Sequence, residues 1–71
     1  MLQGTYIGKY TGKDLCGFKN NHEYEVEIDK TLYGYDVTGV YDKTEDKIVD
    51  AYIRYASEKS INTKWTKLQS K

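Results

Sequence analysis

Apolar and polar side chains alternate with a period of two through most of this chain, and that period is typical of β-strands with one buried face. The alternation is clearest in HEYEVEID, residues 22–29, where Tyr24, Val26 and Ile28 lie on one face and three glutamates lie on the other. We expect the first face in the core and the second in water.

Further segments carry the same pattern, and polar turns separate them. In IVDAYIRYA, residues 48–56, the side with the charged Asp50 and Arg54 also carries Ile48 and Tyr52, and we expect it to face water. The short polar stretches DKT and DKTEDK are expected to form the turns of two hairpins, at residues 29–31 and 42–47. The other predicted strands are residues 3–10, 32–41 and 64–68.

The segment before the last strand breaks the alternation. Ser57 is a residue type that caps helices, Glu58 is favourably placed near a helix N-terminus, and Ile61 supplies an inward apolar side chain. We expect a short helical or 3₁₀ turn here. In the strand that follows, Trp65 should pack on the core and Leu68 should close it.

Five short strands in 71 residues predict a single all-β domain that spans residues 1–71. A chain of this size buries only about 60% of the surface that its unfolded form exposes, so we expect no deep catalytic cleft. Closure of the sheet would remove edges that otherwise pair between molecules. We therefore predict a small five-stranded SH3-like barrel with one short helical or 3₁₀ turn before the last strand.

Two segments, together about a third of the chain, resemble small proteins encoded by phages and mobile elements of Gram-positive bacteria. GFKNNHEYEVEI, residues 17–28, is similar to their GFKxGKxYxVxI turn and strand. IRYASEKSINTKW, residues 53–65, resembles their later pattern of an aliphatic residue, a Tyr-Ser-type turn, a helical turn and an Asn/Lys-Trp ending. The chain departs from the pattern at Asn21 or His22, where a turn glycine is usual, and at Arg54, where proline is common. The resemblance implies an SH3-like barrel and brings no catalytic residues with it.

Eleven basic residues balance eleven acidic ones, which removes any broad attraction to nucleic acid or to an anionic membrane. The balance is uneven along the chain. Residues 1–50 carry six lysines and ten acids, a net charge of −4, whereas residues 51–71 carry five basic residues and one acid, a net charge of +4. One cysteine cannot form an internal disulfide, and no run is apolar enough for a signal peptide or a membrane span. We expect a cytoplasmic protein of a bacterial host with no membrane partner.

Candidate catalytic chemistry rests on one histidine and one cysteine. His22 in its polar turn could activate Cys16, but a packed thiol and a solvated turn histidine are the favoured interpretations. A structural zinc site takes four Cys or His ligands, more than this chain offers. We therefore expect no enzyme activity, no metal and no cofactor.

Seven of the eight tyrosines are divided into two groups. Tyrosines that share a face with aliphatic residues are expected in the core, with their hydroxyls at its rim: Tyr24, Tyr33, Tyr35 and Tyr55. The others are expected outside, and with a nearby arginine and the glutamate stripe they form the predicted partner-binding set: Tyr10, Tyr41, Tyr52, Arg54, Glu23, Glu25 and Glu27. The structural interpretation of the glutamates is a charged face that keeps the strand soluble. The functional interpretation is contact with a basic patch on a partner.

These features predict a non-enzymatic protein-interaction module, borne by a phage or mobile element, that binds and masks a host protein, for example as an inhibitor of a defence or regulatory system. The alternative is single-stranded nucleic-acid or nucleotide binding, with Trp65 as a stacking platform and Lys59, Lys64 and Lys67 along the phosphates. Self-association as a homodimer through a leftover strand edge is compatible with the first hypothesis.

Overall fold

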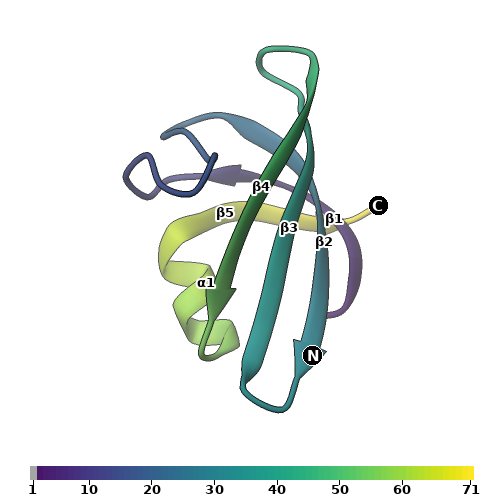
Figure 1. The fold of residues 1–71 in the computed structure, drawn as a ribbon, viewed down its shortest axis with the longest axis vertical. Helices are drawn as coiled ribbons and strands as arrows, with labels where there is room; N and C mark the ends of the chain where they lie inside the picture. The colour runs from purple at the N-terminus through teal and green to yellow at the C-terminus, as the bar shows by residue number, and fades with distance from the viewer. Residues whose placement is uncertain (1) are drawn as a thin grey trace.

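The computed structural model describes residues 2–71, in which five antiparallel strands form one sheet beside one short helix (Figure 1). No helix in this range has the length and apolarity of a membrane span. The order of the strands in the sheet is β4-β3-β2-β1-β5. The predicted mostly-β architecture is confirmed, with these elements: β1 (Gly4–Tyr10), β2 (Glu23–Thr31), β3 (Gly34–Asp42), β4 (Lys47–Tyr55), α1 (Glu58–Lys64) and β5 (Trp65–Ser70).

Helix α1 begins at the predicted cap. The side chain of Ser57 accepts a hydrogen bond from the amide of Ser60 at 3.2 Å, and Glu58 lies in the first turn, where the helix dipole favours a negative charge. Ile61 has no exposed surface and anchors the helix to the core. The capping residue and the inward isoleucine were both correctly predicted.

The hairpin between β2 and β3 is tighter than predicted. Asp29 and Lys30 were expected in a turn, but they continue β2 and pair with Asp36 and Tyr35 of β3. Only two residues, 32 and 33, lie between the paired Thr31 and Gly34. A two-residue connection is sufficient for antiparallel strands, because Gly34 adopts a φ of +135° that most residues avoid.

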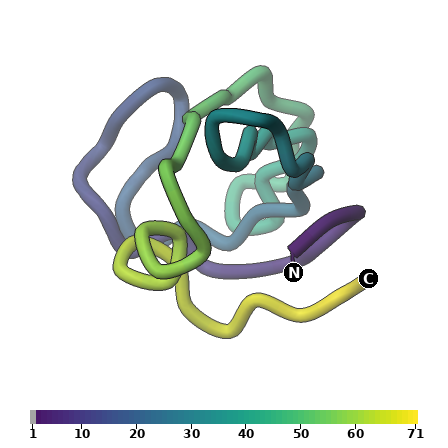
Figure 2. Tube along the Cα trace, turned by 90° about the horizontal axis from the view of Figure 1, so that it is seen from below, coloured from purple at the N-terminus to yellow at the C-terminus, as the bar shows by residue number. Residues whose placement is uncertain are grey.

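The sheet curls strongly around the core. In Figure 1, β2, β3 and β4 run side by side while β1 and β5 cross them at a steep angle. Figure 2 shows the chain winding around a central region, with α1 between the end of β4 and the start of β5. Within residues 2–71, β4 and β5 are the two edges of the sheet and do not pair with each other, so the sheet is not closed by hydrogen bonds.

Side-chain and loop contacts bridge the gap between these two edges. The indole nitrogen of Trp65 donates a hydrogen bond to the hydroxyl of Tyr55 at 3.0 Å, which joins the start of β5 to the end of β4. The loop at residues 11–22 joins the same two sides, because the amide of Thr11 donates to the carbonyl of Lys64 at 2.7 Å and the carbonyl of Cys16 accepts from the amide of Tyr52 at 3.3 Å.

Phe18 from this loop occupies the centre of the core. Its ring lies edge-on to those of Tyr24 and Trp65, with centroids 5.0 and 5.1 Å away, and such pairs are favourable beyond the apolar area that they bury. Gly39 of β3 leaves room for this ring, because a Cβ there would lie 2.7 Å from it. The buried hydrophobic residues are Tyr10, Phe18, Tyr24, Val26, Ile28, Tyr35, Val37, Ala51, Tyr55, Ile61 and Trp65.

Two tyrosines lie on the opposite side from the one predicted. Tyr10 was expected outside but is 2% exposed, and its hydroxyl donates to the carbonyl of Lys13 at 2.6 Å. Its ring packs inward against those of Phe18 and Trp65, with centroids 5.5 and 5.3 Å away. Tyr33 was expected in the core but is 78% exposed, because it belongs to the two-residue turn and not to β3.

The first prediction concerns the hydrogen bond between Tyr55 and Trp65. Tyr55→Phe removes the acceptor of a buried indole N–H, and a buried donor without a partner costs about 1–3 kcal/mol of the free energy of unfolding. Urea denaturation, monitored by tryptophan fluorescence, measures this loss of free energy of unfolding. Tyr33→Phe, which removes the same hydroxyl from an exposed turn, is the matched control and should leave the midpoint unchanged. Equal midpoints for Tyr55→Phe and wild type would contradict this role of the bond.

Candidate partner-binding surface

The outer surface of β2, β3 and β4 carries side chains in three rows that cross the strands. Directly paired residues of an antiparallel sheet point to the same side, so the strand register defines each row. We call this surface the outer face. Its rows are Glu25–Tyr41–Ile48, Glu27–Thr38–Tyr52 and Asp29–Asp36–Arg54.

Carboxylates dominate the outer face. Glu25 forms an ion pair with Lys71, with 2.6 Å between the charged atoms, and Asp36 pairs with Arg54 at 2.8 Å. Within residues 2–71, Glu27 and Asp29 form no ion pair, and the same holds for Glu23 at the start of β2. This side of the protein therefore has a negative local field although the chain is neutral overall.

Asp36 organises the row nearest the β2–β3 turn. One of its carboxylate oxygens accepts hydrogen bonds from the Nε of Arg54 and from the hydroxyl of Tyr52, both at 2.8 Å. The bond from Arg54 and then the bond from Tyr52 lower the pKa of Asp36 below its usual value, and the bond to Asp36 raises the pKa of Tyr52. Asp29 lies directly opposite Asp36, a repulsive placement that Arg54 offsets. The Tyr52 ring is thereby held in place while 44% exposed.

The structure brings most of the predicted partner-binding set together. Tyr52, Arg54, Glu23 and Glu27 are exposed. Tyr41 and Glu25 are half-buried and pair with each other across β2 and β3. Tyr10 does not belong to this surface, because it is buried in the core as described above.

Three exposed apolar residues add to the surface. Ile48 is 84% exposed at the end of its row, as its place among the charged residues of β4 predicted. Leu32 and Tyr33 are 94% and 78% exposed at the β2–β3 turn, and the sequence analysis did not identify them. The signal that could have found them is the pair of bulky residues immediately before Gly34.

The lysines of the nucleic-acid hypothesis are exposed, but its aromatic platform is not. Lys59, Lys64 and Lys67 all lie at the surface. Trp65 is 2% exposed and its N–H is used by Tyr55, so its ring offers no face on which a base could stack. The proposed use of Trp65 as a platform is therefore wrong, because the same side chain fills the core.

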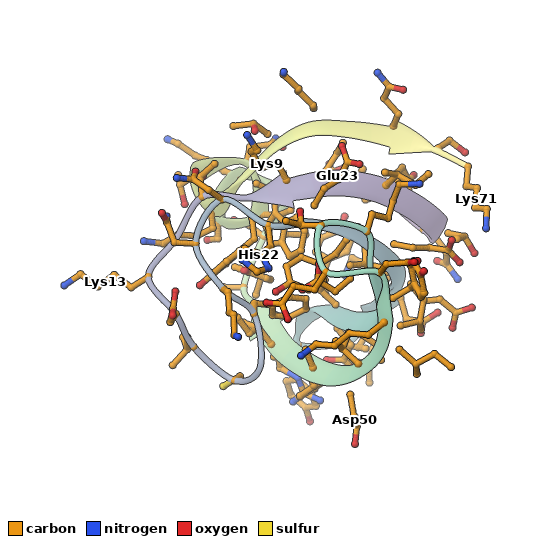
Figure 3. The ribbon with its side chains drawn as sticks, turned by 90° about the horizontal axis from the view of Figure 1, so that it is seen from above. Lys9, Lys13, His22, Glu23, Asp50 and Lys71 are labelled. Atoms are coloured by element: carbon orange, nitrogen blue, oxygen red, sulfur yellow. The ribbon has the colours of Figure 1, made fainter. Side chains whose placement is uncertain are left out.

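His22 takes part in a polar cluster at the other end of the sheet. Its Nδ1 lies 2.9 Å from one oxygen of the buried Asp42 and 3.6 Å from Glu45. The second oxygen of Asp42 accepts from the amides of Thr44 and Glu45, each at 2.9 Å. In Figure 3, seen from above, His22 lies toward the centre, whereas Lys13 and Asp50 point away from the protein. The cluster fastens the loop at residues 11–22 to the β3–β4 turn.

The same cluster has the residue types of a metal site, and one ligand atom from each of its three members lies within 4.8 Å of the others. All three are engaged within the protein, however. Glu45 also binds Lys19 at 3.3 Å and Lys47 at 2.9 Å, so its charge is already compensated. His22 hydrogen-bonds Asp42, while Cys16 is exposed and its carbonyl binds β4. The described residues enclose no pocket for a small molecule.

Comparisons of the chain with protein families, with curated proteins and with solved structures found no match.

Asp42 gives a pH-dependence prediction. Burial alone raises the pKa of Asp42, but the hydrogen bonds from His22 and from the Glu45 and Thr44 amides outweigh it and lower the pKa below the usual value. Because the folded pKa is the lower one, the stabilisation is complete above the unfolded pKa of about 3.9 and is lost as the pH falls through the folded pKa.

We therefore expect Asp42→Asn to reduce the free energy of unfolding by about 1–2 kcal/mol at pH 7, through loss of a charge-assisted bond. The deficit should shrink as the pH falls below about 3.9 and through the folded pKa of Asp42. Urea titrations at a series of pH values measure both, with the exposed Asp50→Asn as the control. A deficit that stays constant from pH 7 to pH 2 would rule out this titration as its cause.

Proposed function

We propose that this protein is a non-enzymatic interaction module, encoded by a phage or mobile element, that binds and masks a surface of a host protein in the host cytoplasm. The observation that carries the proposal is the outer face, where Tyr52 is fixed by Asp36 beside Arg54 within a field of carboxylates. Tyrosine and arginine are enriched among the residues that contribute most to binding between proteins. Side chains that are already held in place lose less entropy on binding.

The scaffold that we propose for this module is an SH3-like barrel. The supporting features are the meander β2–β3–β4, the helix immediately before the last strand, and the return of β5 to pair with β1. The aromatic core and the bond between Tyr55 and Trp65 make such a small scaffold rigid without a disulfide.

Charge complementarity indicates the kind of host surface. Glu23, Glu27 and Asp29 carry negative charge that no ion pair within residues 2–71 compensates. Such a face repels nucleic acid and anionic lipid, and it speeds association with a positively charged protein surface. A basic surface that the host protein needs for its own function is therefore the proposed target, as in an inhibitor of a defence or regulatory system.

Affinity capture from a Gram-positive bacterial lysate tests the proposal. The wild-type protein should retain one dominant, stoichiometric protein partner with a basic binding surface, and retention should weaken as salt screens the charges. The double variant Glu27→Lys/Asp29→Lys should bind that partner at least about tenfold more weakly, because like charges then face each other. Asn62→Lys, which adds a positive charge at an exposed position of α1 outside the rows of the outer face, should bind like wild type.

Three results would contradict the proposal: no partner, recovery of nucleic acid only, or equal binding by the double variant and wild type. Exposed substitutions of this kind change stability by about 0.5 kcal/mol or less, so unfolding does not obscure the comparison. Fluorescence polarisation with a labelled single-stranded oligonucleotide at two salt concentrations tests the alternative directly. We expect no salt-dependent binding at micromolar protein.

A further inference from the structure

The turn between β2 and β3 presents two large apolar side chains to solvent. Leu32 is 94% exposed and Tyr33 is 78% exposed, and together they make up the whole connection between the paired Thr31 and Gly34. Figure 1 shows this hairpin as the lower extremity of the molecule, beyond the rest of the sheet. We call Leu32 and Tyr33 the tip.

Turn geometry does not require these residues. The positive φ that the connection needs is supplied by Gly34, at +135°, and neither tip residue adopts a positive φ. Positions with ordinary backbone angles in a tight turn accept most residue types, and Asn, Asp and Ser are the common choices. Leucine and tyrosine at these positions bury almost nothing in the folded protein, so neither the turn nor the core accounts for them.

The tip is held by its own turn. The hydroxyl of Thr31 accepts a hydrogen bond from the amide of Tyr33 and donates one to the carbonyl of Gly34, both at 3.2 Å. Gly34 packs so closely under the end of β4 that a Cβ there would collide with the carbonyl of Tyr55. A held apolar tip loses little conformational freedom when a partner covers it.

Charged residues of the outer face adjoin the tip. The row Asp29–Asp36–Arg54 is the row nearest the turn, since Asp29 and Asp36 pair only two positions from Thr31 and Gly34. An apolar centre beside a charged border is the usual layout of a binding hot spot with its rim. The border carries both signs, because Asp36 is paired with Arg54 and the ammonium of Lys30 donates to the carbonyl of Thr31 at 2.8 Å, which leaves Asp29 as the carboxylate without an ion pair within residues 2–71.

We propose that Leu32 and Tyr33 form a two-residue anchor that inserts into an apolar pocket on the protein partner, and that a basic side chain beside this pocket meets Asp29. The inference rests on the proposed function, because it names the part of the module that enters its partner. It adds an apolar contact to a surface otherwise defined by charge.

The test uses the full chain and the variant Leu32→Ser/Tyr33→Asn. This change keeps the net charge and replaces the tip by residues common in turns, so the urea midpoint should stay the same or rise. The partner captured by the wild-type protein, once purified, is then titrated with both forms. We expect binding about 30-fold weaker or worse for the variant, the effect of losing a hot-spot residue. Thr63→Ser/Lys59→Gln, at exposed positions of α1, should bind within about twofold of wild type.

A photo-crosslinker placed at position 33 locates the pocket. Cross-links should map to apolar residues of the partner with Lys or Arg nearby, and a crosslinker at Lys13, which points away in Figure 3, should give none. If wild type captures a partner and the tip variant binds it equally well, the anchor is wrong while the proposed function stands. If wild type captures nothing, the proposed function itself fails.

Two further measurements test whether the tip contacts a membrane or a second copy of this chain instead. Sedimentation with phosphatidylcholine/phosphatidylglycerol vesicles should leave the wild-type protein in solution. Binding to the vesicles that the tip variant loses would overturn the anchor in favour of a membrane contact. Light scattering that shows a wild-type dimer and a monomeric tip variant would overturn it in favour of self-association.

Discussion

The packing of Phe18 against the rings of Tyr24 and Trp65 is the interaction on which the rest of the structure depends. The sheet is open between β4 and β5, and two of the buried hydrophobic residues, Phe18 and Ile61, come from outside its strands. Phe18 enters that core from a loop, and Gly39 provides the space for it. The loop, the two edges of the sheet and α1 are thereby joined around one aromatic cluster.

Because the aromatic cluster holds the core together, surface residues are free to vary without loss of the fold. The tyrosines show the division: Tyr24 and Tyr55 fill the core, whereas Tyr52 is held on the outer face by a carboxylate and Tyr33 projects from a turn. Tyrosine thus occurs as a core residue, as an oriented residue on the outer face and as an exposed apolar group at a turn. The three cases differ in what the ring and the hydroxyl of the tyrosine contact in the folded protein.

Sequence alternation predicts the parts of this structure in which the two faces of a strand differ in polarity. Val26 and Ile28 are buried and Glu27 is exposed, as the pattern of β2 requires, and the Ser57 cap is equally local. Alternation does not predict the orientation of β1. One face carries only glycine and tyrosine and the other carries threonine, isoleucine and lysine, so the two faces do not differ clearly in polarity. Tyr10 was therefore misplaced, and its position depends on ring contacts with Phe18 of the loop and Trp65 of β5, which no pattern within β1 specifies.

The candidate surface was predictable in its charges and less so in its apolar part. Glu27, Tyr52 and Arg54 follow from alternation alone, whereas the bond of Asp36 to both Tyr52 and Arg54 requires the register between β3 and β4. The exposure of Tyr33 depended on a shift of the turn by a few residues. Turn boundaries are set by the pairing of two strands, which no local pattern within one of them specifies.

The contact between the loop and β4 limits how a partner can be recognised. A sheet edge normally offers a row of backbone amides and carbonyls to which an extended peptide can add as another strand. On β4 the carbonyl of Cys16 already occupies the amide of Tyr52, in the middle of that row. Backbone augmentation is therefore obstructed on β4, and this edge leaves the proposed recognition to exposed side chains. Such a surface can be retargeted by a few substitutions while the scaffold stays the same.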